Sequence, residues 1–155
     1  MPLFFRCMKK KILIIGYGNP GRLDDGLGPA LAEEIEKLEL SFVTVDSDYQ
    51  LTVEDASYVC EYDVVVFADA SVNCPESYEF KEIIPAKETM SFSSHSCSPE
   101  AVLGLADQLF QSKVKGYALG IRGYEFNEFG QKLSADALLN LQKAKEFIVE
   151  KIQFL

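Results

Sequence analysis

Side chains that bind transition metals follow three separate segments of this 155-residue chain. The pair Asp24–Asp25 comes after the apolar run KILIIG, and Asp69 lies near the end of the run DVVVFADA. His95, the only histidine, stands in the serine-rich stretch SFSSHSCS. Two carboxylates and one imidazole form a small facial ligand set that leaves positions on a divalent metal open for substrate or water. These residues are therefore a candidate metal site.

Each of these residues also has a structural explanation. Asp24 or Asp25 could cap a helix that begins near Gly26, and His95 could be an ordinary polar loop residue. Asp69 is harder to explain in that way, because a carboxylate at a buried strand end costs several kcal/mol unless it is paired or metal-bound. The type and position of Asp69 therefore favour a functional role.

The stretch GYGNPGRLDDG also contains the spacing G-x-G-x-x-G, at Gly16, Gly18 and Gly21, which is typical of dinucleotide-binding folds. Asp46 would then be the acid that binds the ribose. However, the acidic pair stands where the diphosphate should bind, and like charges there repel by several kcal/mol at an effective dielectric near 20. We therefore expect the glycines to shape a tight loop over the strand end, with nucleotide binding as the alternative.

Nucleophilic catalysis has little support in the sequence. The chain lacks the G-x-S-x-G motif, and the spacing of Cys97 two residues after His95 does not by itself make a catalytic pair. The four cysteines show no C-x-x-C spacing, so we expect reduced thiols in a cytoplasmic protein: Cys7, Cys60, Cys74 and Cys97.

Strand-like and helix-like segments alternate along the chain, which predicts an α/β fold. Continuous apolar runs at 11–16 and 63–70 indicate neighbouring central strands that are buried on both faces. We predict one domain over 1–155, with 1–10 as an N-terminal extension in which Met8 is a candidate start. The predicted architecture is a three-layer α/β/α sandwich with a twisted, mostly parallel sheet of about five strands and one antiparallel edge strand. The predicted strands are 11–16, 42–46, 63–70, 78–84 (the edge strand) and 116–122, and the predicted helices are 27–38, about 52–60, 98–111 and one that begins at 134.

The charge of the chain limits its partners. With 24 acidic and 15 basic residues the net charge is −9, which argues against nucleic acid and against an anionic membrane surface. The longest apolar runs are far shorter than a membrane span requires. We therefore expect a soluble cytoplasmic monomer whose partner is a cationic protein or a metal.

The sequence resembles the hydrogenase maturation endopeptidases, which trim the C-terminus of the large subunit of nickel–iron hydrogenases. The resemblance extends over nearly the whole chain, through KILIIGYGNPGRLDDGLGPALAEEIE, VVVFADAS and SSHSCSPEAVLGLA. Its most specific motif is a strand followed by G-x-G-N, a short loop and D-[DE]-G-x-G. The segments YGNPGRLDDG, DYQLTVEDA, IRGYEF and KLSADALLNL are most similar to the branch associated with bidirectional, cofactor-reducing hydrogenases.

The resemblance implies that Asp25, Asp69 and His95 are both the catalytic and the metal-binding residues. Many members of the family have Glu where this chain has Asp25, so the ligand here is one methylene shorter. The metal would be nickel that is already installed in the precursor, with other divalent transition metals as substitutes, and the cut would follow a His or Arg. Asn19 and Asp24 would orient these ligands. The alternatives are a nucleotide-binding module and a hydrogenase assembly factor that does not cut.

Overall fold

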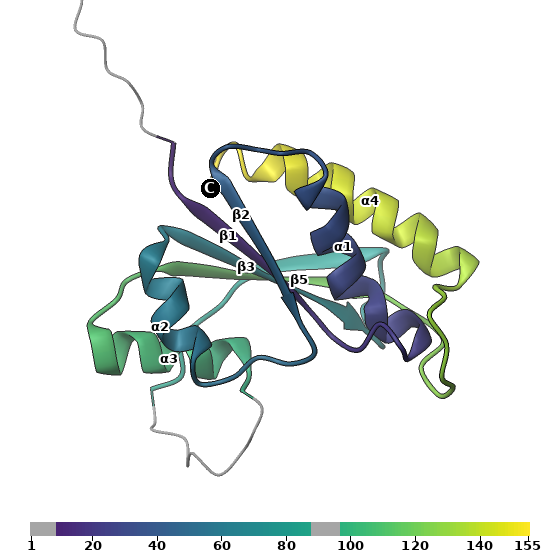
Figure 1. Cartoon of the computed structure of the whole chain (residues 1–155), viewed down its shortest axis with the longest axis horizontal. Coiled ribbons are helices and arrows are strands. Elements are labelled where there is room, and N and C mark those ends of the chain that lie inside the picture. Colours follow the sequence, from purple (N-terminus) through teal and green to yellow (C-terminus); the bar gives the residue numbers. More distant parts are fainter. Residues whose placement is uncertain (1–8, 88–96) are drawn as a thin grey trace, which may run out of the picture.

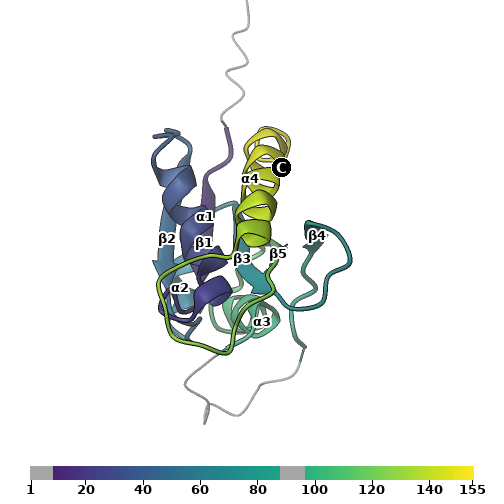
Figure 2. The ribbon, with the colours of Figure 1, turned by 90° about the vertical axis from the view of Figure 1, so that its right-hand side faces the viewer.

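The computed structural model describes residues 9–87 and 97–155, which form a single five-stranded sheet with helices on both faces (Figures 1 and 2). His95 and residues 1–8 of the expected extension lie outside the described residues. The strand order is β2-β1-β3-β5-β4, in which β4 alone is antiparallel to its neighbour. The predicted architecture is therefore confirmed. The strands are β1 (Ile12–Tyr17), β2 (Val43–Asp48), β3 (Val64–Ser71), β4 (Tyr78–Glu82) and β5 (Lys115–Arg122).

The helices lie where the sequence predicts them. Two of them start at serine caps: the hydroxyl of Ser98 accepts a hydrogen bond from the backbone N–H of Ala101, and that of Ser134 accepts one from Ala137. Such caps satisfy backbone donors that have no partner within the helix. The helices are α1 (Leu27–Glu36), α2 (Asp55–Tyr58), α3 (Pro99–Phe110) and α4 (Ala135–Lys151), and short 3₁₀ turns precede α1 (η1, Leu23–Gly26) and follow α2 (η2, Val59–Glu61).

Two apolar cores separate the layers. Along β1, Ile12 and Ile14 pack on the side of α1 and α4, whereas Leu13 and Ile15 pack on the side of α2 and α3. Figure 1 shows the two helix pairs on opposite faces of the sheet. Because successive side chains of a strand point to opposite faces, a continuous apolar run is what a strand with two covered faces requires.

The topology creates a crevice position at the carboxyl ends of β1 and β3. These two strands are parallel neighbours. The strand that follows β1 in the chain, β2, pairs with one side of β1, and the next strand, β3, pairs with its other side. Ligands of open α/β sheets bind at such a switch in strand order. The residues that follow β1 and end β3 are therefore the first to inspect.

None of the helices within the described residues has the length and the apolar character needed to cross a lipid bilayer.

Candidate active site

Asp69 lies at the carboxyl end of β3, on the same face of the sheet as Tyr17, the last residue of β1. The Asp69 carboxylate accepts a hydrogen bond from the Tyr17 hydroxyl and one of 2.8 Å from the backbone N–H of Ala70. Both side chains are partly buried and line a groove of about 600 Å³, which Pro99 and Glu100 at the start of α3 border on another side. The Asp69 carboxylate is thus oriented by two hydrogen bonds and remains accessible from the groove.

The surroundings of Asp69 oppose its negative charge. Burial, together with the charge of Asp25, raises the pKa of this carboxyl from 3.8 to about 6, although the hydrogen bonds from Ala70 and Tyr17 lower it. Burial and the charge of Asp69 also raise the pKa of Tyr17, so its hydroxyl keeps its proton and can donate it in a hydrogen bond. A cation at this position would stabilise the ionised form of Asp69.

Asp25, in η1, lies at the same carboxyl ends of β1 and β3. Its Oδ2 accepts a hydrogen bond of 2.9 Å from the backbone N–H of Asn19, and its carboxylate is partly exposed. The structure thus brings Asp25, Asp69 and Tyr17 together, and we call these three residues the carboxylate site. In the described part of the chain no cluster of three metal-ligating side chains occurs, and His95 is not among the described residues.

Asp24 has a structural role that the sequence does not reveal. It is fully buried, and its carboxylate accepts four hydrogen bonds: the N–H groups of Tyr124 and Glu125 at 2.8 and 3.0 Å, and the N–H and hydroxyl of Ser134 at 2.8 and 2.7 Å. Burial raises the pKa of Asp24, but these hydrogen bonds outweigh it, so that the pKa lies below its ordinary value. Asp24 is therefore a buried, charged anchor for a distant loop.

The alternative explanation, that one of the two acids caps α1, is wrong. The N-cap position of α1 is Gly26, and no side chain accepts a hydrogen bond there. The physical reason is that the 3₁₀ turn η1 directs Asp24 toward the loop 123–134 and Asp25 toward Asn19.

Backbone hydrogen bonds tie the loop 19–26 to the loop 123–134. The N–H of Asp24 donates to the carbonyl of Glu125 at 2.9 Å, that of Leu23 to Gly130 at 3.0 Å, and that of Gly130 to Gly21 at 2.8 Å. Leu23 adopts a left-handed conformation with φ of 51°, which is unfavourable for a residue with a side chain. The contacts that compensate for this strain also fix the position of the adjacent Asp25.

The glycines of the G-x-G-x-x-G spacing pack against the chain itself. Gly18 has φ of 138°, and a side chain there would collide with the backbone carbonyl of Asp25. A side chain at Gly16 would collide with the carbonyl of Gly28 in α1. In a dinucleotide fold the second glycine instead leaves room for the pyrophosphate. The space beside Gly18 is filled by Asp25, which disfavours the nucleotide alternative.

Cys97 is not activated as a nucleophile. Its partial burial, together with the negative charge of Asp55, raises the pKa of its thiol, whereas a reactive cysteine needs a lowered one. Cys60, Cys74 and Cys97 are free thiols.

The sequence interpretation missed Tyr17 and Asn140. Tyr17 could have been found, because the period of two that buries Leu13 and Ile15 places it on their face of the sheet. Asn140 is buried in α4 and donates from Nδ2 to the carbonyl of Arg122 and to the Tyr124 hydroxyl, both at 3.0 Å. It holds the start of the loop 123–134, and no short-range signal in the sequence announces this contact.

The architecture was compared with solved structures. The chain superimposes on the nickel–iron hydrogenase maturation protease HycI of Thermococcus kodakarensis with a TM-score of 0.71 and 23% identity, over 94% of this chain and 95% of that one. The fold is that of the hydrogenase maturation proteases.

Two further structures share the hydrogenase maturation protease fold. The maturating endopeptidase HybD of E. coli gives a TM-score of 0.66 at 21% identity, with 92% of each chain covered. The hydrogenase 2 maturation peptidase of a Thaumarchaeota archaeon gives 0.68 at 19% identity, over 94% of this chain and all (100%) of that one. Comparison with protein-family models and with curated proteins yields no match to the sequence.

Proposed function

We propose that this protein is an endopeptidase that removes the C-terminal peptide from the large-subunit precursor of a nickel–iron hydrogenase. The observation that carries the proposal is the pair of carboxylates Asp25 and Asp69 at the carboxyl ends of β1 and β3. The fold that holds them is shared with hydrogenase maturation proteases. The motif resemblance over the same residues supports it. The branch that serves bidirectional hydrogenases remains the expectation for the substrate.

We further propose that Asp25, Asp69 and His95 bind the nickel carried by the precursor, so that cutting follows nickel insertion. The donor set fits such an ion, because carboxylate oxygen and imidazole nitrogen are ligand types that divalent transition metals accept. The raised pKa of Asp69 fits it too, since a nearby cation would offset the burial and the charge of Asp25. Other divalent transition metals would substitute.

Bound there, the metal would supply Lewis acidity, which polarises a scissile carbonyl or lowers the pKa of a bound water. The chain supplies positioning. The Tyr17 hydroxyl and the Ala70 N–H hold Asp69, and the Asn19 N–H holds Asp25. Hydrogen bonds that orient ligand carboxylates in this way typically sharpen both affinity and geometry at metal sites.

The deciding experiment incubates the purified protein with nickel-loaded large-subunit precursor and weighs the product by mass spectrometry. We expect a shortened subunit with the natural protein and none with Asp69→Asn or His95→Ala. Glu150→Gln changes an exposed acid of α4 and is the matched control, for which we expect full processing. Circular dichroism should show all three variants folded, because Asp69 is only partly buried at the end of its strand.

Two outcomes contradict the proposal in different ways. An unshortened precursor with the natural protein would identify a hydrogenase assembly factor without peptidase activity. Unfolding of Asp69→Asn would instead assign that carboxylate to the scaffold.

We also propose that the protein acts as a cytoplasmic monomer. Sedimentation velocity of the purified chain tests this state, and a dimer mass would contradict it.

A further inference from the structure

The outer edge of β2 is open in the described part of the chain, because β2 ends the sheet order and pairs only with β1. The carbonyls of Phe42 and Asp48 accept hydrogen bonds from Ile12 and Gly18 of the β1 side, at 3.1 and 3.0 Å. Since backbone groups alternate along a strand, those of Val45 point away from β1. An open edge of this kind can pair with another extended chain.

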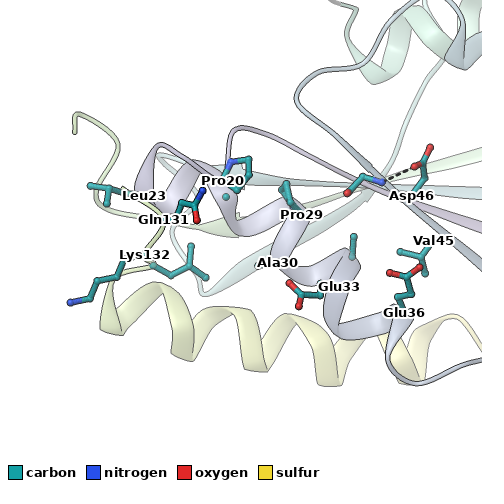
Figure 3. A pocket seen from close by; sticks show the side chains of 14 residues that line it. Pro20, Leu23, Pro29, Ala30, Glu33, Glu36, Val45, Asp46, Gln131 and Lys132 are labelled. Atoms are coloured by element: carbon teal, nitrogen blue, oxygen red, sulfur yellow. Dashed lines mark hydrogen bonds between the residues drawn. The ribbon is translucent and has the colours of Figure 1, made fainter. Parts of the chain in front are cut away.

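A continuous groove runs beside this edge, between β2 and α1. Its central part has a volume of about 590 Å³ and is lined by Pro29, Glu33, Glu36, Val45 and Ser47, among others. A hollow of about 260 Å³ continues it at one end and shares Glu36 and Val45. Another hollow of about 260 Å³ continues it at the other end and shares Pro29 and Ser47. Figure 3 shows the central part, with side chains of α1 in the middle, Val45 and Asp46 of β2 at one end, and Gln131 and Lys132 at the other.

The charge along the groove is predominantly negative. Glu33 and Glu36 line the central part with their side chains, and Lys132 is the one basic lining residue that the structure describes. Asp46 also lines it, but its side chain alternates with that of Val45 and lies on the other face of the sheet, near Asp55. Glu33 lies 3.3 Å from Lys37, so part of its charge is offset. The terminal hollows add Glu39 at one end and Asp48 at the other; these acids suit a cationic occupant.

The groove ends beside the loop that carries Asp25. Its terminal hollow is lined by Gly18 and Pro20, in the loop that holds Asp25. The Oδ1 atom of Asp25 lies 3.7 Å from the position that a Cβ on Gly18 would take. An extended chain in the groove would therefore arrive beside Asp25.

We propose that the edge of β2 and this groove bind an extended, basic segment of the substrate chain, which adds to the sheet as a strand and leads to the carboxylate site. This inference rests on the proposed peptidase function. Backbone pairing would supply the affinity, and the acids of the groove would select lysine or arginine at alternate positions. The six residues of β2 match a segment of about six residues, roughly 20 Å long.

The test uses a fluorescein-labelled hexapeptide of alternating lysine and valine as the probe, with fluorescence anisotropy as the readout. We expect binding to the natural protein, and binding weaker by at least about tenfold when the backbone nitrogens of alternate residues are methylated, because pairing then fails. A hexapeptide of alternating glutamate and valine should not bind. Equal binding of the methylated and unmethylated lysine peptides would overturn the inference.

Val45→Pro tests the protein side. It removes an N–H that points outward, a change that edge strands tolerate, and Val45→Ala is the control that loses similar packing but keeps the N–H. We expect Val45→Pro to weaken probe binding and to raise KM for the nickel-loaded precursor by about tenfold, with kcat retained, an effect clearly larger than that of Val45→Ala. Glu150→Gln, on α4 and outside the groove, should behave as the natural chain. Cutting by Val45→Pro with unchanged KM would overturn this inference and leave the peptidase function intact. Probe binding that depends on the β2 edge, without any cutting of the precursor, would support this inference and contradict the peptidase function.

Discussion

At the scale of single residues, Asp69 is a carboxylate whose environment opposes its own charge. Burial and the neighbouring Asp25 raise its pKa to about 6, whereas the hydrogen bonds from Ala70 and Tyr17 work in the opposite direction. A carboxylate in this balance responds strongly to a cation or to a change in pH.

The first prediction concerns stability against pH in metal-free protein. The folded chain holds the Asp69 proton more tightly than the unfolded chain, so the stabilisation is complete below about pH 4 and is lost as the pH rises to about 6. The loss in unfolding free energy should be on the order of 3 kcal/mol. Urea unfolding in the presence of a chelator, from pH 4 to pH 7, should show this loss of unfolding free energy in the natural chain and not in Asp69→Asn. Parallel stability curves for the two proteins would contradict the pKa assignment.

Tyr17→Phe should change Asp69 without touching its carboxylate. The Tyr17 hydrogen bond lowers the pKa of Asp69, so its removal should raise that pKa further in an NMR titration of the carboxyl carbon. Affinity for Ni²⁺ measured by calorimetry should fall by about tenfold, the usual effect of losing a group that orients a ligand. Tyr117→Phe is the control, because Tyr117 stacks on Phe80 on the opposite face of the sheet from Asp69. Unchanged values for Tyr17→Phe would show that this hydroxyl does not position Asp69.

The acids of the candidate site could be predicted from the sequence, because acidic residues are unusual near the ends of apolar runs. The different roles of Asp24 and Asp25 could not be predicted. The partners of Asp24 are 100, 101 and 110 residues away, so no local pattern distinguishes the anchor from its neighbour.

At the scale of elements, the loops 19–26 and 123–134 form one unit around Asp24. Asp24→Ala would leave the N–H groups of Tyr124, Glu125 and Ser134 without their acceptor. We expect a loss of about 3 kcal/mol in unfolding free energy, because buried donors without partners are costly. Urea unfolding measures this loss.

Hydrogen exchange separates this anchor role from a general loss of stability. The amides of Tyr124 and Glu125 should exchange faster in Asp24→Ala than those of the central strand β3. Asp136→Ala alters an exposed acid in the first turn of α4 and should cost less than about 1 kcal/mol. Equal costs for the two variants would mean that the Asp24 hydrogen bonds do not stabilise the loop.

Most elements could be predicted because their signals are local. The caps at Ser98 and Ser134 and the apolar run of β3 each depend on a few adjacent residues. The end of β2 could not: the strand continues from the expected 46 to Asp48, since pairing with Gly16 and Tyr17 of β1 extends it. An acidic, exposed segment such as DSD carries no strand signal of its own.

At the scale of the whole molecule, the α/β fold alone is compatible with nucleotide binding as well as with the proposed peptidase. The stabilisation of the folded chain by a ligand distinguishes these two functions. We expect Ni²⁺ to raise the melting temperature, since a ligand at 100 times its Kd stabilises the folded state by about 2.7 kcal/mol. NAD, ATP and FMN should not, because Asp25 fills the space beside Gly18. Asp69→Asn should remove the nickel effect. Stabilisation by a nucleotide and none by nickel would reverse the assignment.

The anchoring of Asp24 by Tyr124, Glu125 and Ser134 also has a consequence for biosynthesis. Contacts between residues 100 or more positions apart form only after both partners have left the ribosome. The loop that carries Asp25 therefore cannot complete its native hydrogen bonds on a nascent chain that ends before residue 134. If the protein is a peptidase, its competence to cut therefore begins only after residue 134 has left the ribosome.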